Sequence, residues 1–184
     1  MDWYLLAKTI HILSATVLFG TGLGIAFFFL MGLRRGDPAG AYLAARTTVL
    51  ADMVFTLSAG IVQPLSGFWL IGIAGYDPLA PWLVWSYVLY LLALACWLPV
   101  VWLQLRLRDM LGAKLAGEAI DEARLHRCFR WWFALGWPAF VGLVAVFWLM
   151  VAKPACRCGC WCSAATAISA VMCVAHWLVT RGSG

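Results

Sequence analysis

The chain has 184 residues, of which 65% are hydrophobic and only 11% are charged. A soluble domain typically carries about 25% charged residues, so this composition excludes a protein whose whole surface faces water and predicts an integral membrane protein. The formal net charge is +5. It does not indicate nucleic-acid binding, because the basic residues cluster between apolar stretches rather than along one polar face. The predicted partner of the chain is therefore the lipid bilayer.

The first apolar stretch, residues 3–30, contains two ionisable side chains, Lys8 and His11. It exceeds the roughly 20 residues that a helix needs to cross a bilayer, and no proline interrupts it. Lys8 and His11 are three residues apart, so they share one face of the helix, which Ser14 and Gly22 continue. An ionisable group is costly inside a membrane, so this face is the first candidate site.

Gly20 and Gly24 fall on nearly the opposite side of the same span. Small residues at this spacing are typical of close helix packing in membranes. We therefore expect a neighbouring helix to approach the first span here.

Three further apolar stretches follow, and the four together predict an all-α fold, an integral membrane four-helix bundle covering residues 1–154. The second span contains Gln63 followed by Pro64, and a proline removes a backbone hydrogen bond, so a kink is expected there. Residues 39–46 are expected to form a short helical lead-in at the surface, and the polar residues 106–130 a helical extension or hairpin. The predicted spans are residues 3–32, 47–74, 81–105 and 131–152.

The distribution of basic residues predicts the orientation of the chain. By the positive-inside rule, the first and third connections are cytoplasmic, and the second, which has no basic residue, is outside. The chain is then expected in the inner (cytoplasmic) membrane of a bacterium, with its N-terminus outside. His11 lies about two turns below the outer surface, and Gln63 and Tyr90 fall at a similar depth. The basic residues of the two cytoplasmic connections are Arg34, Arg35, Arg46, Arg106, Arg108, Lys114, Arg124, Arg127 and Arg130.

Residues 155–184 differ in composition from the rest and are predicted to be a Cys-rich C-terminal appendage. Their four alternating cysteines do not match the C-x-x-C spacing of zinc or iron–sulfur sites. Two interpretations stay open for them, a trap for copper(I) and an aberrant terminus. The apolar residues 163–179 either form a fifth, short membrane segment or lie at the interface. The four cysteines are Cys156, Cys158, Cys160 and Cys162.

Four stretches of the chain carry a resemblance to known families: KTIHILSATVLFGTGLG, VQPLSGFWLIGIAG, PWLVWSYVLYLLALACWLPVVWLQLRLRD and FALGWPAFVGLVAVFWLMVAKP. Over residues 1–154 the chain resembles an uncharacterised family of predicted bacterial integral membrane proteins. In outline it is similar to the HemJ-type protoporphyrinogen oxidases, which have a K-x-x-H pair early in helix one, a G-x-W-L after helix two and a last helix ending in Lys-Pro. It is also similar in outline to the CopD-type copper-resistance membrane proteins.

The HemJ resemblance implies a bundle that binds haem b, with His11 at the position of that family's helix-one ligand. It also implies redox or tetrapyrrole chemistry with quinone or oxygen as electron partner, so that an enzymatic activity would be that of an oxidoreductase. The chain departs from the HemJ pattern at Ser86 and Cys96, where that family has a lysine and a histidine, and at residues 135–138, which lack its asparagine–glutamate pair. These departures leave the oxidation of protoporphyrinogen open. They affect haem binding less, since one axial histidine suffices for a five-coordinate haem.

The residues themselves leave three interpretations of His11. As an axial ligand, its neutral imidazole would coordinate haem iron between the helices, with Ser14 on the same face and Gly22 leaving room for the flat macrocycle. As a copper ligand, it would lack the methionine-rich or second-histidine face that copper needs. As a structural residue, it would bond to a neighbouring backbone or to Gln63.

The other candidate residues also have alternatives. Lys8 either snorkels to the interface or pairs with a propionate of a bound tetrapyrrole. Gln63 and Tyr90 either orient His11 in a cofactor site or join helices without a cofactor. Asp52 is expected to pair with Arg46 or with another basic residue of the cytoplasmic loops, and a role in a proton path is the alternative.

Three functions are therefore consistent with the sequence. The first is a haem-b-binding membrane protein of redox or tetrapyrrole metabolism, with His11 as the iron ligand. The second is a membrane protein of copper transport or tolerance, with the tail cysteines as the capture site. The third is a cofactor-free subunit of a homo-oligomer or of a larger membrane complex.

Overall fold

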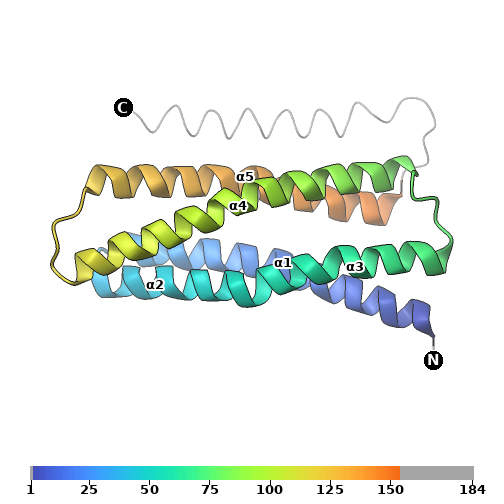
Figure 1. Cartoon of the computed structure of the whole chain (residues 1–184), viewed down its shortest axis with the longest axis horizontal. Helices are drawn as coiled ribbons and strands as arrows, with labels where there is room; N and C mark the ends of the chain where they lie inside the picture. The colour runs from blue at the N-terminus through green and yellow to red at the C-terminus, as the bar shows by residue number, and fades with distance from the viewer. Residues whose placement is uncertain (1, 154–184) are drawn as a thin grey trace. The chain divides into compact units, whose positions relative to one another are not determined.

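The computed structural model of the protein describes residues 2–153, and the regular elements in that range are all helices (Figure 1). The tail cysteines and the predicted fifth segment lie outside the described residues. The elements are α1 (Trp3–Arg34), α2 (Pro38–Ala51), the π-helix η1 (Asp52–Thr56), α3 (Leu57–Ala74), α4 (Pro81–Leu115) and α5 (Glu122–Ala152).

Four helices of the described chain are long and apolar enough to cross a membrane. Three of them are α1, α4 and α5, with 32, 35 and 31 residues. The fourth is the continuous 37-residue helix Pro38–Ala74, which α2, η1 and α3 form together. Because a span needs only about 20 residues, each of these helices can cross the bilayer and project beyond it. The predicted all-α fold with four membrane spans is confirmed.

The second span begins earlier than the sequence predicts. Residues 39–46 are helical, as predicted, but they are continuous with the second span, because α2 starts at Pro38 and continues through η1 into α3, and Ala41 and Ala45 are buried rather than at the surface. The Asp37 carboxylate fixes this start by accepting hydrogen bonds from the backbone N–H groups of Ala39 at 3.1 Å and Gly40 at 2.9 Å. Proline at the first helical position and the alanine-rich sequence that follows favour a helix from there onward.

The second span contains a π-helix, η1, that the sequence does not predict, and the kink expected at Pro64 stays a prediction. The helix α3 continues through Pro64, whereas the five residues Asp52–Thr56 form a π-helix. Such a segment is one wider turn inserted into an α-helix, and it is frequent at functional sites. The π-helix begins at Asp52, whose side chain is only 1% exposed.

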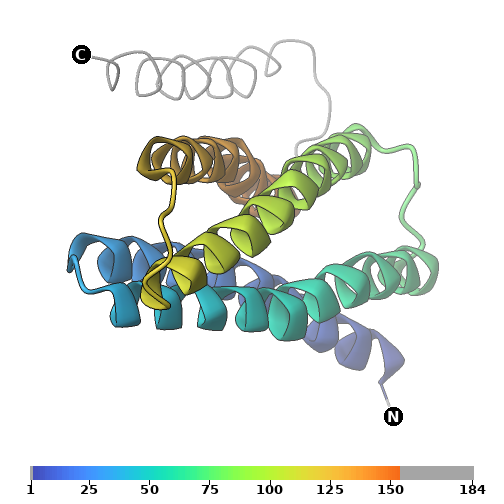
Figure 2. The ribbon, with the colours of Figure 1, turned by 60° about the vertical axis from the view of Figure 1, so that its left-hand side comes forward.

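The described chain divides into two compact units, and each is described by itself. The first contains residues 2–77 and 104–125. In this unit α1 packs antiparallel against α2, η1 and α3 (Figure 2). At one end, the rings of Trp3 and Trp69 lie with their centroids 6.3 Å apart. Toward the other end, a Cβ built on Gly32 would lie 2.5 Å from the Cβ of Ala44, so glycine allows the two backbones to approach closely.

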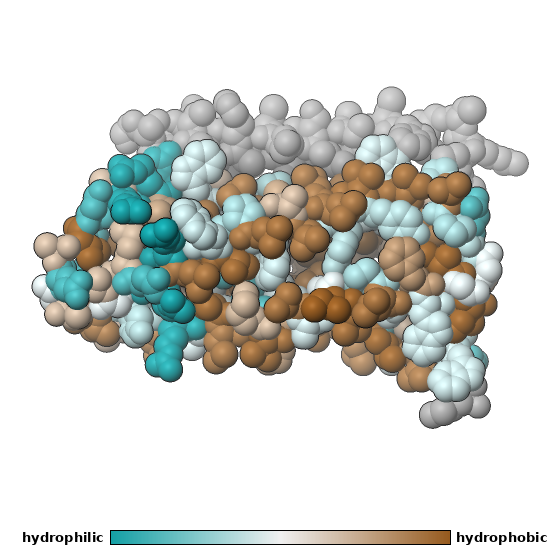
Figure 3. Space-filling model, viewed as in Figure 1, coloured by the Kyte–Doolittle hydropathy of each residue, from teal (hydrophilic) through white to brown (hydrophobic). Residues whose placement is uncertain are grey.

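The first unit also contains the connection between α4 and α5. The predicted polar extension is present, because α4 continues to Leu115 and α5 begins at Glu122. An ion pair of 2.5 Å between the Lys114 ammonium and Glu122 closes this turn, and Gly117 adopts a φ of +81° within it. Figure 3 shows hydrophilic side chains gathered at this end and hydrophobic ones along the helices. The distribution agrees with helices embedded in lipid and a polar connection in water.

The second unit contains residues 78–103, which include the first part of α4 and its preceding turn, and residues 126–153. Gly142 of α5 faces the backbone of α4, since a Cβ built on it would lie 3.6 Å from the carbonyl oxygen of Leu89. The ammonium of Lys153 lies 5.7 Å from the centroid of the Trp82 ring. These contacts join the end of α5 to the start of α4.

The predicted close packing at Gly20 and Gly24 is absent among the described residues of the first unit. No described atom lies within 4 Å of a Cβ built on either glycine. The face of α1 that packs in this unit is marked instead by Ser14 and Gly32, which are separated by five full turns of helix. Gly20 and Gly24 lie to the side of that face.

The contact at Gly32 predicts that a change from glycine to alanine affects stability differently at position 32 and at position 24. Gly32→Ala should destabilise the protein by about 1–3 kcal/mol, because the new methyl group overlaps Ala44. Gly24→Ala has open space around the new methyl group and should be neutral or slightly stabilising. Thermal unfolding in detergent, followed by circular dichroism, measures both. Equal melting temperatures for the two variants would contradict the close approach of α1 and α2.

Candidate functional site

The imidazole of His11 is held between α1 and α3 by two hydrogen bonds. Its Nδ1 lies 3.0 Å from the hydroxyl oxygen of Ser66, and its Nε2 lies 3.1 Å from the side-chain nitrogen of Gln63. Ser66 is buried, whereas His11 and Gln63 are half-buried. The structure thus brings His11 and Gln63 together, as the sequence predicts.

The chemistry of the partners determines which nitrogen of His11 carries the proton. The amide nitrogen of Gln63 can only donate, so Nε2 of His11 accepts this hydrogen bond. The neutral ring then carries its proton on Nδ1 and donates it to Ser66. The hydroxyl of Ser66 donates in turn to the backbone carbonyl of Val62, at 2.8 Å. The ring is therefore a neutral imidazole with its lone pair on Nε2.

Ser14 completes the cluster from the side of α1. Its hydroxyl lies within hydrogen-bonding distance of two acceptors, the side-chain oxygen of Gln63 and, at 3.0 Å, the backbone carbonyl oxygen of His11. A hydroxyl has a single proton, so Ser14 donates to one of these two acceptors at a time. When it donates to Gln63, the hydrogen bonds run from Ser14 through Gln63 and His11 to Ser66 and the carbonyl of Val62.

Helical spacing explains why these side chains meet. His11 and Ser14 are three residues apart on α1, and Gln63 and Ser66 are three residues apart on α3, so each pair shares one helix face. Gly67 adds the necessary space, because a Cβ at this position would lie 3.2 Å from Cε1 of His11. The imidazole therefore packs directly against the backbone of α3.

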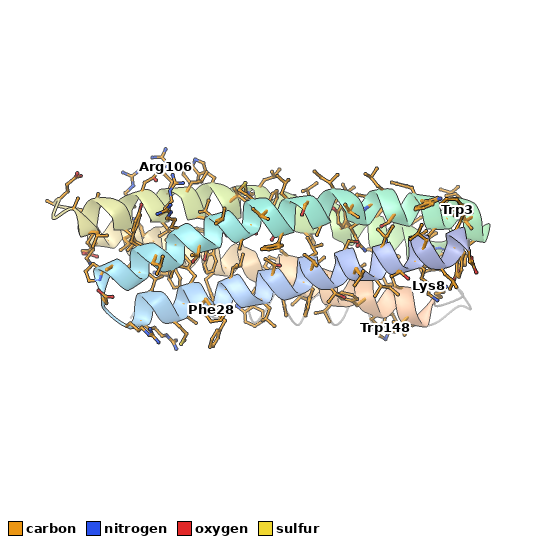
Figure 4. All side chains as sticks on the ribbon, turned by 90° about the horizontal axis from the view of Figure 1, so that it is seen from below. Trp3, Lys8, Phe28, Arg106 and Trp148 are labelled. Carbon is orange, nitrogen blue, oxygen red and sulfur yellow. The ribbon has the colours of Figure 1, made fainter. Side chains whose placement is uncertain are left out.

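Lys8 lies outside this cluster. Its side chain is exposed, and its ammonium is 5.6 Å from the centroid of the Tyr4 ring, one turn closer to the N-terminus. Figure 4 shows Lys8 near the same end of α1 as Trp3. This position fits a side chain that reaches the membrane interface. The predicted pairing with a propionate stays a prediction.

The remaining predicted residues are not assembled around His11 in the first unit. No described atom lies within 4 Å of a Cβ built on Gly22, so the helix surface is open there. Tyr90 belongs to the second unit, and its place beside His11 stays a prediction. Asp52 is buried whereas Arg46 is exposed, and six residues of helix place them on different faces, which disfavours Arg46 as the partner. Pairing with another basic residue of the cytoplasmic loops stays a prediction.

The sequence does not single out two residues of the cluster, Ser66 and Gly67. The signal for Ser66 was its spacing, because it lies three residues after Gln63 and must share its face. Gly67 had no comparable signal, because only the packing of α1 on α3 shows that a glycine is required there.

The described residues offer no ready copper site. Among residues 2–153 no group of three or more His, Cys, Asp or Glu side chains is placed to hold a metal ion. The copper interpretation therefore depends on the tail cysteines, which lie outside that range.

The approach of α3 to the imidazole predicts the effect of a methyl group at Gly67. Gly67→Ala should push the ring away from Ser66 and weaken the bond to Nδ1, because the new Cβ is closer to Cε1 than ordinary contacts allow. The side-chain ¹⁵N and ¹H chemical shifts of His11 in detergent measure this bond. Gly72→Ala, on the same helix with open space around it, is the matched control and should leave the shifts unchanged. Unchanged shifts in both variants would mean that the His11 ring does not pack against Gly67.

Comparison with known proteins gives one match. The sequence profile of a family described as "Predicted integral membrane protein (DUF2269)" matches residues 5–154. No curated protein and no solved structure matches the chain. The matched range includes His11 and its three hydrogen-bonding partners, so the whole polar cluster lies inside it.

Proposed function

Because the chain belongs to the DUF2269 family of predicted integral membrane proteins, we propose that it acts within the bilayer as a haem-b-binding protein of redox or tetrapyrrole metabolism. His11 is the proposed iron ligand. The observation that carries the proposal is the state of its ring, a neutral imidazole in a membrane helix with Nδ1 bonded to Ser66.

The donor set fits an axial haem ligand. A histidine that binds a metal through Nε2 normally donates its Nδ1–H to a neighbouring oxygen, which fixes the tautomer and the ring orientation. Ser66 supplies that oxygen at 3.0 Å, and Nε2 keeps its lone pair. A fixed, neutral imidazole in a water-poor environment is the form that coordinates haem iron.

Other residues of α1 fit the same proposal. The open helix surface at Gly22 offers no steric obstacle to a flat ligand. Lys8 lies one turn from His11 toward the end of the helix, within reach of an anionic substituent on a ligand held by His11. Bound haem b would supply one-electron chemistry at its iron, and quinone, oxygen or a tetrapyrrole is the proposed reaction partner.

The proposal does not extend to the oxidation of protoporphyrinogen. Ser86, which stands where the HemJ pattern has an ionisable residue, is buried and donates a hydrogen bond of 2.7 Å to the carbonyl of Trp82. That hydroxyl is engaged within its own helix and cannot replace a lysine or histidine as a proton carrier.

One observation favours a second candidate function. Both nitrogens of the His11 ring already have partners within the protein, as expected of a residue that joins α1 to α3. In that case the chain would be a cofactor-free subunit of a homo-oligomer or of a larger membrane complex. A colourless preparation that co-purifies with a partner would support this candidate.

Removal of the imidazole tests the haem assignment. Protein purified in detergent after growth with a haem precursor should show a Soret band, and His11→Ala should abolish it, because no other ligand is proposed for the iron. His126→Ala is the control, since that histidine is exposed on α5, and it should keep the band. A Soret band that survives His11→Ala would contradict His11 as the iron ligand. An unmodified protein without a Soret band would contradict haem binding altogether.

We also propose the orientation of the chain in a bacterial inner membrane. The turn between α3 and α4 has no basic residue, whereas the connection between α4 and α5 lies among Arg106, Arg108, Lys114 and Arg124. The positive-inside rule then places residues 75–80 outside and residues 116–121 in the cytoplasm.

Reporter fusions in bacteria test this orientation. A phosphatase that is active only outside the cytoplasm should be active when fused after Asp77 and inactive when fused after Gly117. A β-galactosidase, which is active only in the cytoplasm, should give the reverse pattern. The opposite result for both reporters would invert the proposed topology.

A further inference from the structure

We infer that Gln63 gates the proposed ligand site by occupying the coordinating nitrogen of His11. The inference rests on the proposed function for the identity of the ligand. The contact that carries it is between the side-chain nitrogen of Gln63 and Nε2 of His11, at 3.1 Å. Iron needs the same lone pair that this N–H group uses, so the amide must leave before coordination occurs.

The structure holds the amide in this competing orientation. The side-chain oxygen of Gln63 accepts a hydrogen bond from Ser14, which turns the NH₂ group toward His11. Pro64 follows Gln63 directly, and Ser66 and Gly67 fix the ring from the other side. The orientation of the amide therefore depends on both helices.

Release of the amide requires only a local change. When Gln63 turns away, the hydroxyl of Ser14 still has the backbone carbonyl of His11 as an acceptor, at 3.0 Å. The bond between Nδ1 and Ser66 does not involve Gln63 and keeps the ring in place. Nε2 is thus exposed without disturbing the packing of α1 on α3.

The cost of breaking one neutral hydrogen bond sets the expected size of the effect. The net value of such a bond corresponds to about a five- to tenfold change in an equilibrium constant. Gln63 should therefore weaken ligand binding by about that factor. Its role is positional, since it acts on the ligand through His11.

Two substitutions at this position should act in opposite directions. Gln63→Leu keeps the approximate volume but removes the competing N–H, so affinity for the ligand should rise by about five- to tenfold. Gln63→Glu places a carboxyl group against Nε2, where its hydrogen bond to the ring is stronger than that of the amide. Affinity should then fall by about tenfold or more. A residue with a merely structural role would shift affinity in the same direction in both variants.

The test is a titration of haem-free, detergent-purified protein with hemin, followed at the Soret band. Gln104→Leu is the matched control, because it removes another buried glutamine whose side-chain oxygen has no hydrogen-bond partner among the described residues. Its affinity should equal that of the unmodified protein. Weaker binding by Gln63→Leu, or tighter binding by Gln63→Glu, would overturn the inference.

A second measurement separates this inference from the proposed function. In the haem-free protein, the ¹⁵N spectrum of His11 should show a proton on Nδ1 and a hydrogen-bonded acceptor at Nε2, and Gln63→Leu should remove only the bond at Nε2. If hemin does not bind at all but this spectrum is found, the haem proposal is wrong, whereas the hydrogen bond from Gln63 to Nε2 of His11 is confirmed. A proton on Nε2 would mean that the amide faces the ring with its oxygen, and the gating role would be wrong.

Discussion

A polar side chain inside hydrocarbon must find its hydrogen bonds within the protein, because no water is present to supply them. This constraint shapes the meeting of α1 and α3. His11 has a partner for each ring nitrogen, and the groups that serve it come from both helices. Lipid is as apolar as the side chains around it, so hydrophobic burial alone gives these helices little reason to pair. The polar cluster and the close backbone approaches supply that reason.

The pairing of α1 with the second span depends on small residues at two positions along the helices. Gly67 lets the backbone of α3 touch the imidazole, and Gly32 lets α1 touch α2 near Ala44. Between these two points the second span passes through the π-helix that begins at Asp52. A π-turn shifts the register of the residues that follow it, so it affects which face of α3 is presented to α1. The polar cluster lies beyond that turn.

The cluster has a property that separates it from a simple helix-joining bond. Ser66 fixes the proton on Nδ1, and Gln63 is the only described side chain bonded to Nε2. Nδ1 therefore contacts a hydroxyl that is itself bonded to the backbone of α3, while Nε2 contacts the amide at the end of a longer side chain. A metal-binding histidine normally has such an oxygen at the nitrogen that does not bind the metal. This arrangement is the reason for proposing a binding role.

The sequence by itself determined the membrane class and the four spans, and it marked His11 as a candidate, because hydropathy and the cost of an intramembrane ionisable group are properties of the residues alone. It also placed Gln63 at the depth of His11. Tertiary structure decided which small residues allow close approach, since Gly20 and Gly32 look alike in sequence and differ only in what faces them. It likewise decided that Ser66 and Gly67 join the cluster around His11, and that the second span contains a π-helix beginning at Asp52. Those features depend on which helix faces meet, and one chain's residue pattern does not contain that information.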